Sequence, residues 1–393
     1  MNGIFTAPLV RERRIVVCVG AGGVGKTTTA AALGVAAAVA GRRSLLLTID
    51  PANRLASSLG LPELGGDAAP VPLASLNIRA GGALDAMRLD ARATFDGLIQ
   101  RLAPSPDAAE AIRTSRLYEN VASRLAASES YMAVEKLYEL ATEDPPDLIV
   151  LDTPPTKHAL DFLDAPQRIL DVLNSRVLAI LQNPVSALTR RGSRLPQFVL
   201  GTILRALEQF TGLTLMRDIA DFVRAFDGMI DSLRARAESV ERLLRAPTTA
   251  FVLVTVPNTV GVGRTEAFYR TLEEAAVPCA GLIVNRVLPR SLFDRGLLPP
   301  EPATMPQLPA GLADKLVRTF NDFQSAAADE YAAIEQLRER LALGERLAEV
   351  PAFPGDLASL DDVARFARIL MDGDGEPSWS LGTNCSWMPH SRG

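Results

Sequence analysis

The sequence predicts an α/β fold in which a mostly parallel sheet is flanked by helices and carries an inserted α-helical subdomain. Three observations lead to this prediction. Short apolar runs alternate with helical stretches along the 393 residues, which is typical of a parallel sheet. The runs are continuous rather than alternating, as expected when helices cover both faces of the strands. Residues 165–245 show helical spacing without a strand signal, which indicates a helical insertion between strands.

Each predicted strand is one of these apolar runs. The strongest lie at 15–20, 44–50, 148–152, 251–256 and 281–285, and weaker strands are predicted at 76–79, 87–89 and 348–351. The strands and the insertion divide the chain into four parts. The core domain is expected to cover 1–164 and 246–371, with the helical subdomain at 165–245 between its two parts, and 372–393 are expected to be a disordered tail.

A phosphate-binding motif follows the first predicted strand. Residues 20–27 read Gly-Ala-Gly-Gly-Val-Gly-Lys-Thr and match the pattern G-x-x-x-x-G-K-S/T at every position. The glycines let backbone N–H groups turn toward one anion, and the Ala-rich helix that follows directs its positive end to the same place. Lys26 can then bridge the β- and γ-phosphates of a nucleoside triphosphate, and the Thr27 hydroxyl can bind Mg²⁺. The expected phosphate-binding residues are Gly22, Gly23, Val24, Gly25, Lys26, Thr27 and Thr28.

The same glycines also fit the dinucleotide fingerprint G-x-G-x-x-G, with Asp50 after the next apolar run in the place of a ribose-binding acid. The Gly-Lys-Thr ending has no role under a pyrophosphate, however, and Asp50 lies somewhat far from Gly25 for that fingerprint. The triphosphate interpretation is therefore favoured.

Two acids stand at the ends of predicted core strands. Asp152 ends the run 148–151, where an acid beside a phosphate loop holds Mg²⁺ through its water shell. Asp50 ends the run 44–49, where a carboxylate can orient or deprotonate a water in line with the γ-phosphate. Each acid has the alternative role of a cap for the following helix. The complete phosphate loop favours the metal role for Asp152, while the two roles of Asp50 stay open on these residues alone.

Three ordered motifs together resemble a known family. They are the loop Gly-x-Gly-Gly-Val-Gly-Lys-Thr-Thr, the segment Asp-Pro-Ala-x-x-Leu from Asp50, and the segment Asp-Thr-x-Pro-Thr-x-His-x-Leu from Asp152. They look like the loop and two switches of the arsenite-pump and tail-anchored-protein-targeting ATPases, the ArsA/Get family of P-loop NTPases. The Asp-Thr-Pro-Pro variant resembles a bacterial subgroup. The long helical insertion after the second switch is also shared with that family.

The resemblance implies ATP and Mg²⁺ as ligands and a set of site residues. Lys26, Thr27 and Thr28 would hold phosphates and Mg²⁺, Asp50 would activate water, and Asp152 would lie at the second switch. Asn285 would read adenine, with the segment from Pro351 to Phe353 lining the base.

The sequence departs from the family at residues that join two subunits. The first lysine of the loop, which in the family reaches the partner's phosphates, is replaced by Ala21. The Cys-x-x-Cys pair that binds zinc across the dimer is absent from the sequence. We therefore expect a dimer with weak intrinsic activity, or one in which a lysine-bearing paralogous ATPase completes the site.

The expected function is a Mg²⁺-dependent ATPase that couples ATP binding and hydrolysis to a client, either in membrane-protein targeting or as an anion-export subunit. The apolar residues of the insertion could line a groove for a hydrophobic client helix or simply pack together. Two alternatives are a targeting factor that uses ATP only as a switch and a positioning ATPase like ParA or MinD. An arsenite site needs clustered thiols, whereas Cys18 lies in the first predicted core strand and Cys279 lies just before another.

Composition limits the partners and the compartment. The net charge is −5 and no basic block occurs, so no nucleic-acid partner is expected. No apolar run approaches the ~20 residues of a spanning helix, and the N-terminus lacks the apolar core of a signal peptide. The three cysteines are scattered, as in a reducing compartment. The expected location is the cytoplasm, with membrane attachment only through a partner.

Overall fold

The computed structural model describes residues 3–50, 54–76, 81–114, 129–154, 161–173, 229–290, 310–353, 355 and 357–372. The chain divides into two compact units, of which the first holds 1–88, 140–160 and 245–393 and the second 89–139 and 161–244. The second unit thus takes in 89–139, which the sequence analysis assigned to the core. Residues 174–228 of the predicted insertion and the tail 373–393 lie outside the described residues, so their organisation stays a prediction.

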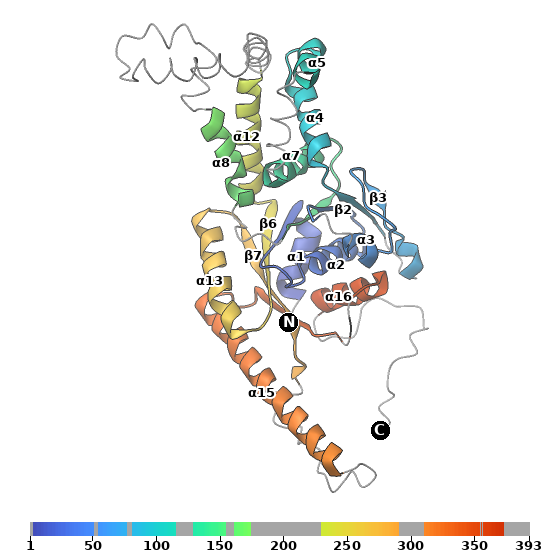
Figure 1. Cartoon of the computed structure of the whole chain (residues 1–393), viewed down its shortest axis with the longest axis vertical. Helices are drawn as coiled ribbons and strands as arrows, with labels where there is room; N and C mark the ends of the chain where they lie inside the picture. Colours follow the sequence, from blue (N-terminus) through green and yellow to red (C-terminus); the bar gives the residue numbers. More distant parts are fainter. Residues whose placement is uncertain are drawn as a thin grey trace, which may run out of the picture. The chain divides into compact units, whose positions relative to one another are not determined.

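An eight-stranded sheet forms the centre of the first unit, in the order β3-β4-β2-β5-β1-β6-β7-β8. Figure 1 labels β2, β3, β6 and β7 of this sheet. All neighbours pair in parallel except β3 and β4, which are antiparallel. The predicted α/β fold with a mostly parallel sheet is therefore confirmed. The strands are β1 (Ile15–Val19), β2 (Arg43–Thr48), β3 (Ala69–Pro70), β4 (Ala83–Arg88), β5 (Leu148–Asp152), β6 (Thr249–Thr255), β7 (Cys279–Val287) and β8 (Leu347–Pro351).

The central strands are apolar throughout because both of their faces are covered. Every residue of β1, β5 and β6 is buried, which accounts for the continuous apolar runs. One weak prediction was wrong in its start, since Leu76 ends a 3-10 helix, η1 (Leu73–Leu76), instead of beginning a strand. Residues 77–80, the rest of that predicted strand, lie outside the described residues.

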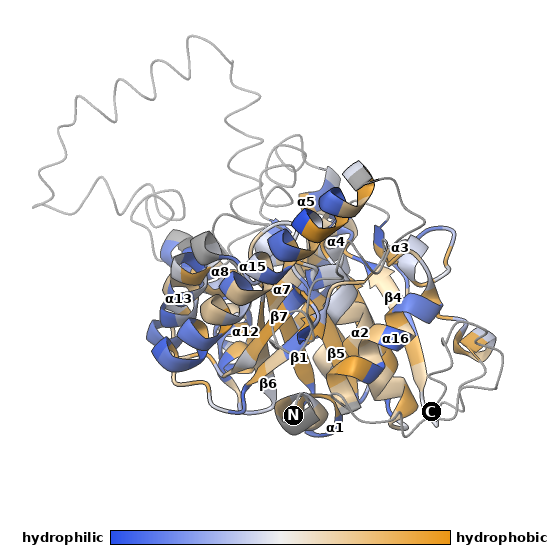
Figure 2. Ribbon diagram, turned by 90° about the horizontal axis from the view of Figure 1, so that it is seen from below, coloured by the Kyte–Doolittle hydropathy of each residue, from blue (hydrophilic) through white to orange (hydrophobic). Residues whose placement is uncertain are grey.

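Helices cover both faces of the sheet. On one face lie α1 (Gly3–Glu12), α2 (Lys26–Val39), α3 (Arg54–Ser58) and α16 (Leu360–Asp372), which contribute to one hydrophobic cluster with alternate strand residues such as Val16 and Val150. On the other, α13 (Thr259–Glu274) packs on β6 and β7, and the 31-residue α15 (Ala310–Arg340) packs on α13 and β7. Figure 2 shows the strands in apolar colours and hydrophilic residues on the outer helix faces.

The apolar side of α16 belongs to the core. Val363, Phe366 and Leu370 are fully buried, and the helix packs against α2 and α1. The amphipathic pattern of this segment thus reflects packing onto the fold, because the helix buries one face and leaves acids such as Asp361 on the other.

The described part of the second unit is helical. It contains α4 (Ala91–Leu102), α5 (Pro106–Thr114), α8 (Asp161–Leu173), most of α7 (Glu129–Thr142) and all but the last residue of α12 (Ile230–Arg245). The fully buried Glu135 of α7 forms an ion pair of 2.6 Å with Arg236 of α12. The Arg236 guanidinium also lies 4.0 Å from the centre of the Tyr138 ring. These contacts tie two helices that are distant in sequence.

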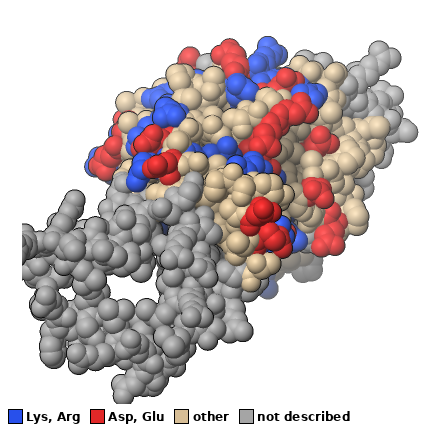
Figure 3. Space-filling model, turned by 90° about the horizontal axis from the view of Figure 1, so that it is seen from above, with Lys and Arg blue, Asp and Glu red and all other residues tan. Residues whose placement is uncertain are grey.

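Among the described residues, no helix is both long and apolar enough to cross a membrane. Acidic and basic side chains are interspersed over the described part of the face in Figure 3, so that neither sign of charge dominates it.

Candidate functional site

The phosphate loop lies between β1 and α2, as the motif predicted. Gly25 immediately precedes α2 and has a left-handed φ of +98°. A Cβ at Gly25 would come within 2.1 Å of Nδ2 of Asn285, so that only glycine fits without displacing a neighbour. The loop is thus closely packed against the end of β7.

Asn285 holds the loop in this place. Its side-chain amide donates a hydrogen bond of 2.9 Å to the carbonyl of Val24, and its Oδ1 accepts a bond of 2.9 Å from the backbone N–H of Arg286. Asn285 is 4 % exposed. The structure therefore gives Asn285 a role that the sequence analysis did not foresee, which is to link β7 to the phosphate loop.

Asp152, the last residue of β5, links this strand to the end of β2 and to the start of α2. It is fully buried, and its Oδ2 accepts hydrogen bonds from the hydroxyls of Thr27 (2.9 Å) and Thr48 (3.0 Å). Its Oδ1 is buried and has no hydrogen-bond partner within the described part of the chain. Burial raises the pKa of Asp152 to about 6, although the two hydroxyls and Lys26 act in the opposite direction. A buried carboxylate with one unpaired oxygen is costly unless a cation approaches it.

Lys26 is turned toward its own loop. Its Nζ donates a hydrogen bond of 2.9 Å to the carbonyl of Ala21, and the residue is 6 % exposed. Burial lowers the pKa of Lys26, while Asp152, Cys18 and Asp50 act to raise it. An ammonium group that is already desolvated and close to the loop gains strongly from an incoming polyanion.

Asp50 follows β2 beside these groups. Its backbone N–H donates a hydrogen bond of 3.2 Å to the hydroxyl of Thr48, the same hydroxyl that donates to Asp152. The carboxylate lines the same cavity as Lys26. Residues 51–53 of the first switch segment and 155–160 of the second lie outside the described residues.

A cavity of about 990 Å³ opens above the loop. This volume is at the upper end of the range for ligand pockets. Of the predicted site residues, Gly22, Val24, Asp152 and Pro351 do not line it, and Val24 and Asp152 are buried behind it. The predicted residues that do line it are Gly23, Gly25, Lys26, Thr27, Thr28, Asp50, Asn285 and Phe353.

Sequence reasoning missed other residues of the cavity wall. Arg54 of α3 belongs to the segment Asp-Pro-Ala-x-x-Leu that starts at Asp50, so its position in that motif could have indicated it, whereas Ser57 lies two residues beyond the end of that segment. Arg286 carries no such signal except that it follows Asn285. Ala352, which lies within the predicted segment from Pro351 to Phe353, lines the cavity as well, and the remaining lining residues that were not predicted are Ser58, Thr153, Gly355, Leu357 and Ala358.

The sequence profile of the anion-transporting ATPases matches residues 13–296. The chain belongs to this family. The resemblance noted from the three motifs is thus confirmed. The chain is 28% identical to ATPase GET3B of Arabidopsis thaliana over 312 residues, which cover 72% of this chain and 66% of that protein. It is 26% identical to ATPase GET3C of the same plant, covering 72% and 70%. It is also 26% identical to ATPase ARSA1 of Chlamydomonas reinhardtii, covering 71% and 36%.

The chain therefore spans just under two thirds of the length of GET3B and about a third of that of ARSA1. The family match extends from before β1 to beyond β7. It includes the phosphate loop, Asp50, Asp152 and Asn285, and it ends before the segment around Phe353.

The residues of this family member fit a hard divalent cation. The Thr27 hydroxyl and the unpaired Oδ1 of Asp152 are oxygen donors, which Mg²⁺ prefers. No group of three or more His, Cys, Asp or Glu side chains in the described ranges could hold a metal. The two oxygen donors from Thr27 and Asp152 suit Mg²⁺ in particular, because Mg²⁺ keeps several waters and takes its other ligands from substrate phosphates.

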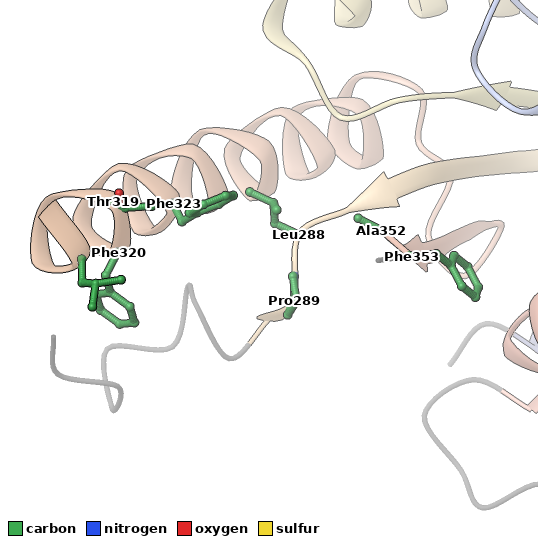
Figure 4. Close-up of a pocket in the computed structure, with 8 residues that line it drawn as sticks. Leu288, Pro289, Thr319, Phe320, Phe323, Ala352 and Phe353 are labelled. Atoms are coloured by element: carbon green, nitrogen blue, oxygen red, sulfur yellow. The ribbon is translucent and has the colours of Figure 1, made fainter. Parts of the chain in front are cut away.

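A second, apolar cavity of about 470 Å³ lies beside the first. Figure 4 shows Phe320 and Phe323 on α15 near Leu288 and Pro289, which follow β7. Phe353 lines both cavities and stacks on Phe366 of α16, with ring centres 6.0 Å apart. The cavity above the phosphate loop and the apolar cavity thus share the Phe353 side chain as part of their walls.

Proposed function

We propose that this chain binds ATP with Mg²⁺ in the cavity above the phosphate loop and hydrolyses it. The observation that carries the proposal is the arrangement around Asp152. A fully buried carboxylate with one unpaired oxygen shares its other oxygen with the Thr27 hydroxyl, directly beneath a loop that fits a triphosphate. This arrangement is unfavourable without a cation and becomes favourable with one.

The proposed roles follow from position. Gly22 to Gly25 would direct backbone N–H groups at the phosphates, and Thr28 would add a hydroxyl. Lys26 would leave the Ala21 carbonyl and neutralise the β- and γ-phosphates. Asn285 and Phe353 would border the adenine base, with Pro351 supporting the segment that carries Phe353.

Asp50 is proposed to orient and deprotonate the attacking water. It lines the cavity on the β2 side, and its charge contributes to the pKa of both Asp152 and Lys26. Mg²⁺, held by Thr27 and through water by Asp152, would neutralise charge on the phosphate oxygens.

We further propose that nucleotide state is passed to a client through the helical unit. The second switch segment runs from Asp152 toward α8, which begins at residue 161 and lies in the second unit. A change at Asp152 would therefore be passed to the second unit through the short segment of sequence between Asp152 and α8. The client is proposed to be a hydrophobic helix or membrane protein, the location cytoplasmic, and the active form a dimer.

The anion-export alternative is less well supported. Cys18 is fully buried in β1 and burial raises its pKa. Cys279 is at the start of β7, where burial raises its pKa to about 11. A soft metalloid binds thiolates that lie together, whereas the buried Cys18 and the half-buried Cys279 lie on different strands.

The decisive experiment compares ATP hydrolysis by the wild type and by Asp50→Asn, with nucleotide affinity measured in parallel. We expect Asp50→Asn to lower turnover by about 10²–10⁴-fold, as for a lost general base, with little change in ATP affinity. The matched control is Asp67→Asn, which removes one charge from an exposed residue outside the cavity. An Asp50→Asn protein that turns over at the wild-type rate would rule out Asp50 as the base.

A further inference from the structure

Arg286 has a backbone conformation that is costly for its residue type. Its φ is +62°, in the left-handed region where a residue with a Cβ loses of order 1–2 kcal/mol. It lies where the pairing of β7 with β8 shifts register, between Asn285 and Val287. Glycine would adopt this conformation without that cost. Strain of this kind persists mainly at functional sites.

The strain places a cationic side chain in the cavity. Arg286 is exposed although its two strand neighbours are buried, and it lines the cavity above the phosphate loop. Within the described residues, its guanidinium has no hydrogen bond or ion pair. Its backbone N–H, in contrast, is bonded to Asn285. The conformation therefore serves Asn285, or the Arg286 side chain, or both.

The sheet order places Arg286 away from the reacting end of the triphosphate. In the order β2-β5-β1-β6-β7-β8, β2 and β7 lie on opposite sides of β1, each two strands away. Neighbouring strands are about 4.8 Å apart, so each end lies about 10 Å from the loop. Asp50 follows β2, and Arg286 is on β7. The nucleoside therefore extends toward Arg286 when the γ-phosphate faces Asp50.

The neighbours of Arg286 are suited to a base. Ala352, Phe353 and Leu357, which come after β8, line the same cavity as Arg286, and the backbone N–H of Ala352 donates a hydrogen bond of 2.8 Å to the carbonyl of Val287, the residue next to Arg286. An arginine guanidinium is planar, weakly hydrated and stacks on aromatic rings. In the proposed site Lys26 is closer to the γ-phosphate than Arg286 is. The positive charge of Arg286 is therefore not needed to bind the γ-phosphate.

We infer that Arg286 is a nucleotide-contacting residue that covers the face of the purine base and sets affinity for the nucleoside part of the substrate. This inference rests on the proposed ATP site. It differs from that proposal because it concerns the base rather than the phosphates. It also explains the strained backbone of Arg286 by the position of its side chain, and not only by the hydrogen bond to Asn285.

The test uses Arg286→Gly, which removes the side chain and relieves the backbone. The full-length protein is titrated calorimetrically with ATP, with ADP and with inorganic tripolyphosphate, each with Mg²⁺. We expect Arg286→Gly to melt at the wild-type temperature or above, and to bind ATP and ADP about tenfold more weakly, as for a lost cation–π contact. Tripolyphosphate binding should stay unchanged. Arg286→Lys, which keeps the charge without the planar group, should lose most of the same affinity.

Ala342→Gly is the matched control, because Ala342 also has a positive φ of +46° and does not line the cavity. It should gain stability without any change in affinity. Unchanged ATP and ADP affinity in Arg286→Gly would overturn the inference. The strained backbone would then be explained by the hydrogen bond between the Arg286 N–H and Asn285 alone. An equal loss for tripolyphosphate, or a lower melting temperature, would overturn it as well. A wild type that binds no nucleotide would instead refute the proposed function.

Discussion

Asp152 is a single residue whose burial makes the stability of the fold depend on pH. The folded pKa of about 6 exceeds the ordinary value of 3.8. A carboxyl group whose pKa is raised by folding stabilises the fold below the unfolded pKa, and that contribution is lost as the pH rises through the folded pKa. The shift corresponds to about 3 kcal/mol. The stability of the metal-free protein should therefore fall between about pH 4 and pH 6.

In the presence of a chelator at pH 7.5, Asp152→Asn should raise the melting temperature of the protein. The substitution removes the buried charge, while the amide oxygen of the new side chain still accepts hydrogen bonds from the hydroxyls of Thr27 and Thr48. The gain should shrink as the pH is lowered toward 4, where the wild-type carboxyl is itself protonated. Thermal melts at both pH values test this. A lower melting temperature for Asp152→Asn at pH 7.5 would contradict it.

Gly25 permits a second prediction at the residue scale. Gly25→Ala would force the Asn285 amide from the Val24 carbonyl, because the new Cβ would lie 2.1 Å from Nδ2. We expect a loss of stability of about 1–3 kcal/mol from the backbone alone and a further loss of ATP binding.

Gly41→Ala is the control for Gly25→Ala, since Gly41 has a φ of +91° and open space around its Cβ position. It should show the backbone cost without any effect on nucleotide affinity. Melting temperature and ATP titration of both variants decide the matter, and an equal affinity loss in the two would contradict the packing explanation.

At the scale of elements, the ion pair between α7 and α12 is expected to hold the helical unit together. Burial raises the pKa of Glu135, and Arg236 acts against that rise. Arg236→Ala leaves a buried carboxylate without its partner, which should cost about 3–5 kcal/mol at pH 8. The cost should be smaller at pH 5 than at pH 8, because loss of Arg236 removes the interactions that lower the pKa of Glu135, and a larger fraction of the carboxyl group is then protonated at the lower pH.

Urea unfolding of Arg236→Ala at the two pH values measures this difference. A double variant, Glu135→Leu with Arg236→Met, should lose less stability than the single one because no charge stays buried. An equal loss for Arg236→Ala at pH 5 and pH 8 would indicate that packing on Tyr138, rather than charge, is what Arg236 contributes.

The elements also show which patterns predict structure. The five strong strands were found because helices cover both faces and every position must be apolar. β4 extends over Ala83–Arg88, well before its predicted start, because Asp85 interrupts the apolar pattern on a strand near the edge of the sheet. β3 was missed because its two residues pair through backbone groups alone and carry no hydropathy signal.

At the scale of the whole molecule, Ala21 bears on the active assembly. The resemblance noted in the sequence implies a lysine at this position that would reach the phosphates of a partner subunit. Ala21 is exposed on the loop and cannot supply that charge. We therefore expect either that an unlike partner completes the site or that the purified chain hydrolyses ATP slowly.

Ala21→Lys should raise the turnover of the purified protein, by a factor of ten or more if the chain forms a dimer with itself, because a transferred cation stabilises the transition-state charge. Steady-state hydrolysis is compared with that of Ala21→Met, which has similar length and no charge. Equal rates for the two variants would argue against a missing cation. Native mass spectrometry of protein from its own host then tests for the paralogous partner.

The motifs alone established a phosphate loop, two strand-end acids and an α/β fold, because each depends on residues close together in the sequence and on the period of one element. The roles of Lys26 and Thr27 and the strand before them were predicted from neighbouring residues in the sequence alone. The tertiary structure decided which distant residues complete the site. Parallel strands bring their carboxyl ends to one edge of the sheet. At this edge Asn285 supports the phosphate loop, and Asp152 accepts hydrogen bonds from Thr27 and Thr48. Arg286, whose backbone is strained, lines the cavity there. These contacts depend on strand order and register, which no local pattern of residues specifies.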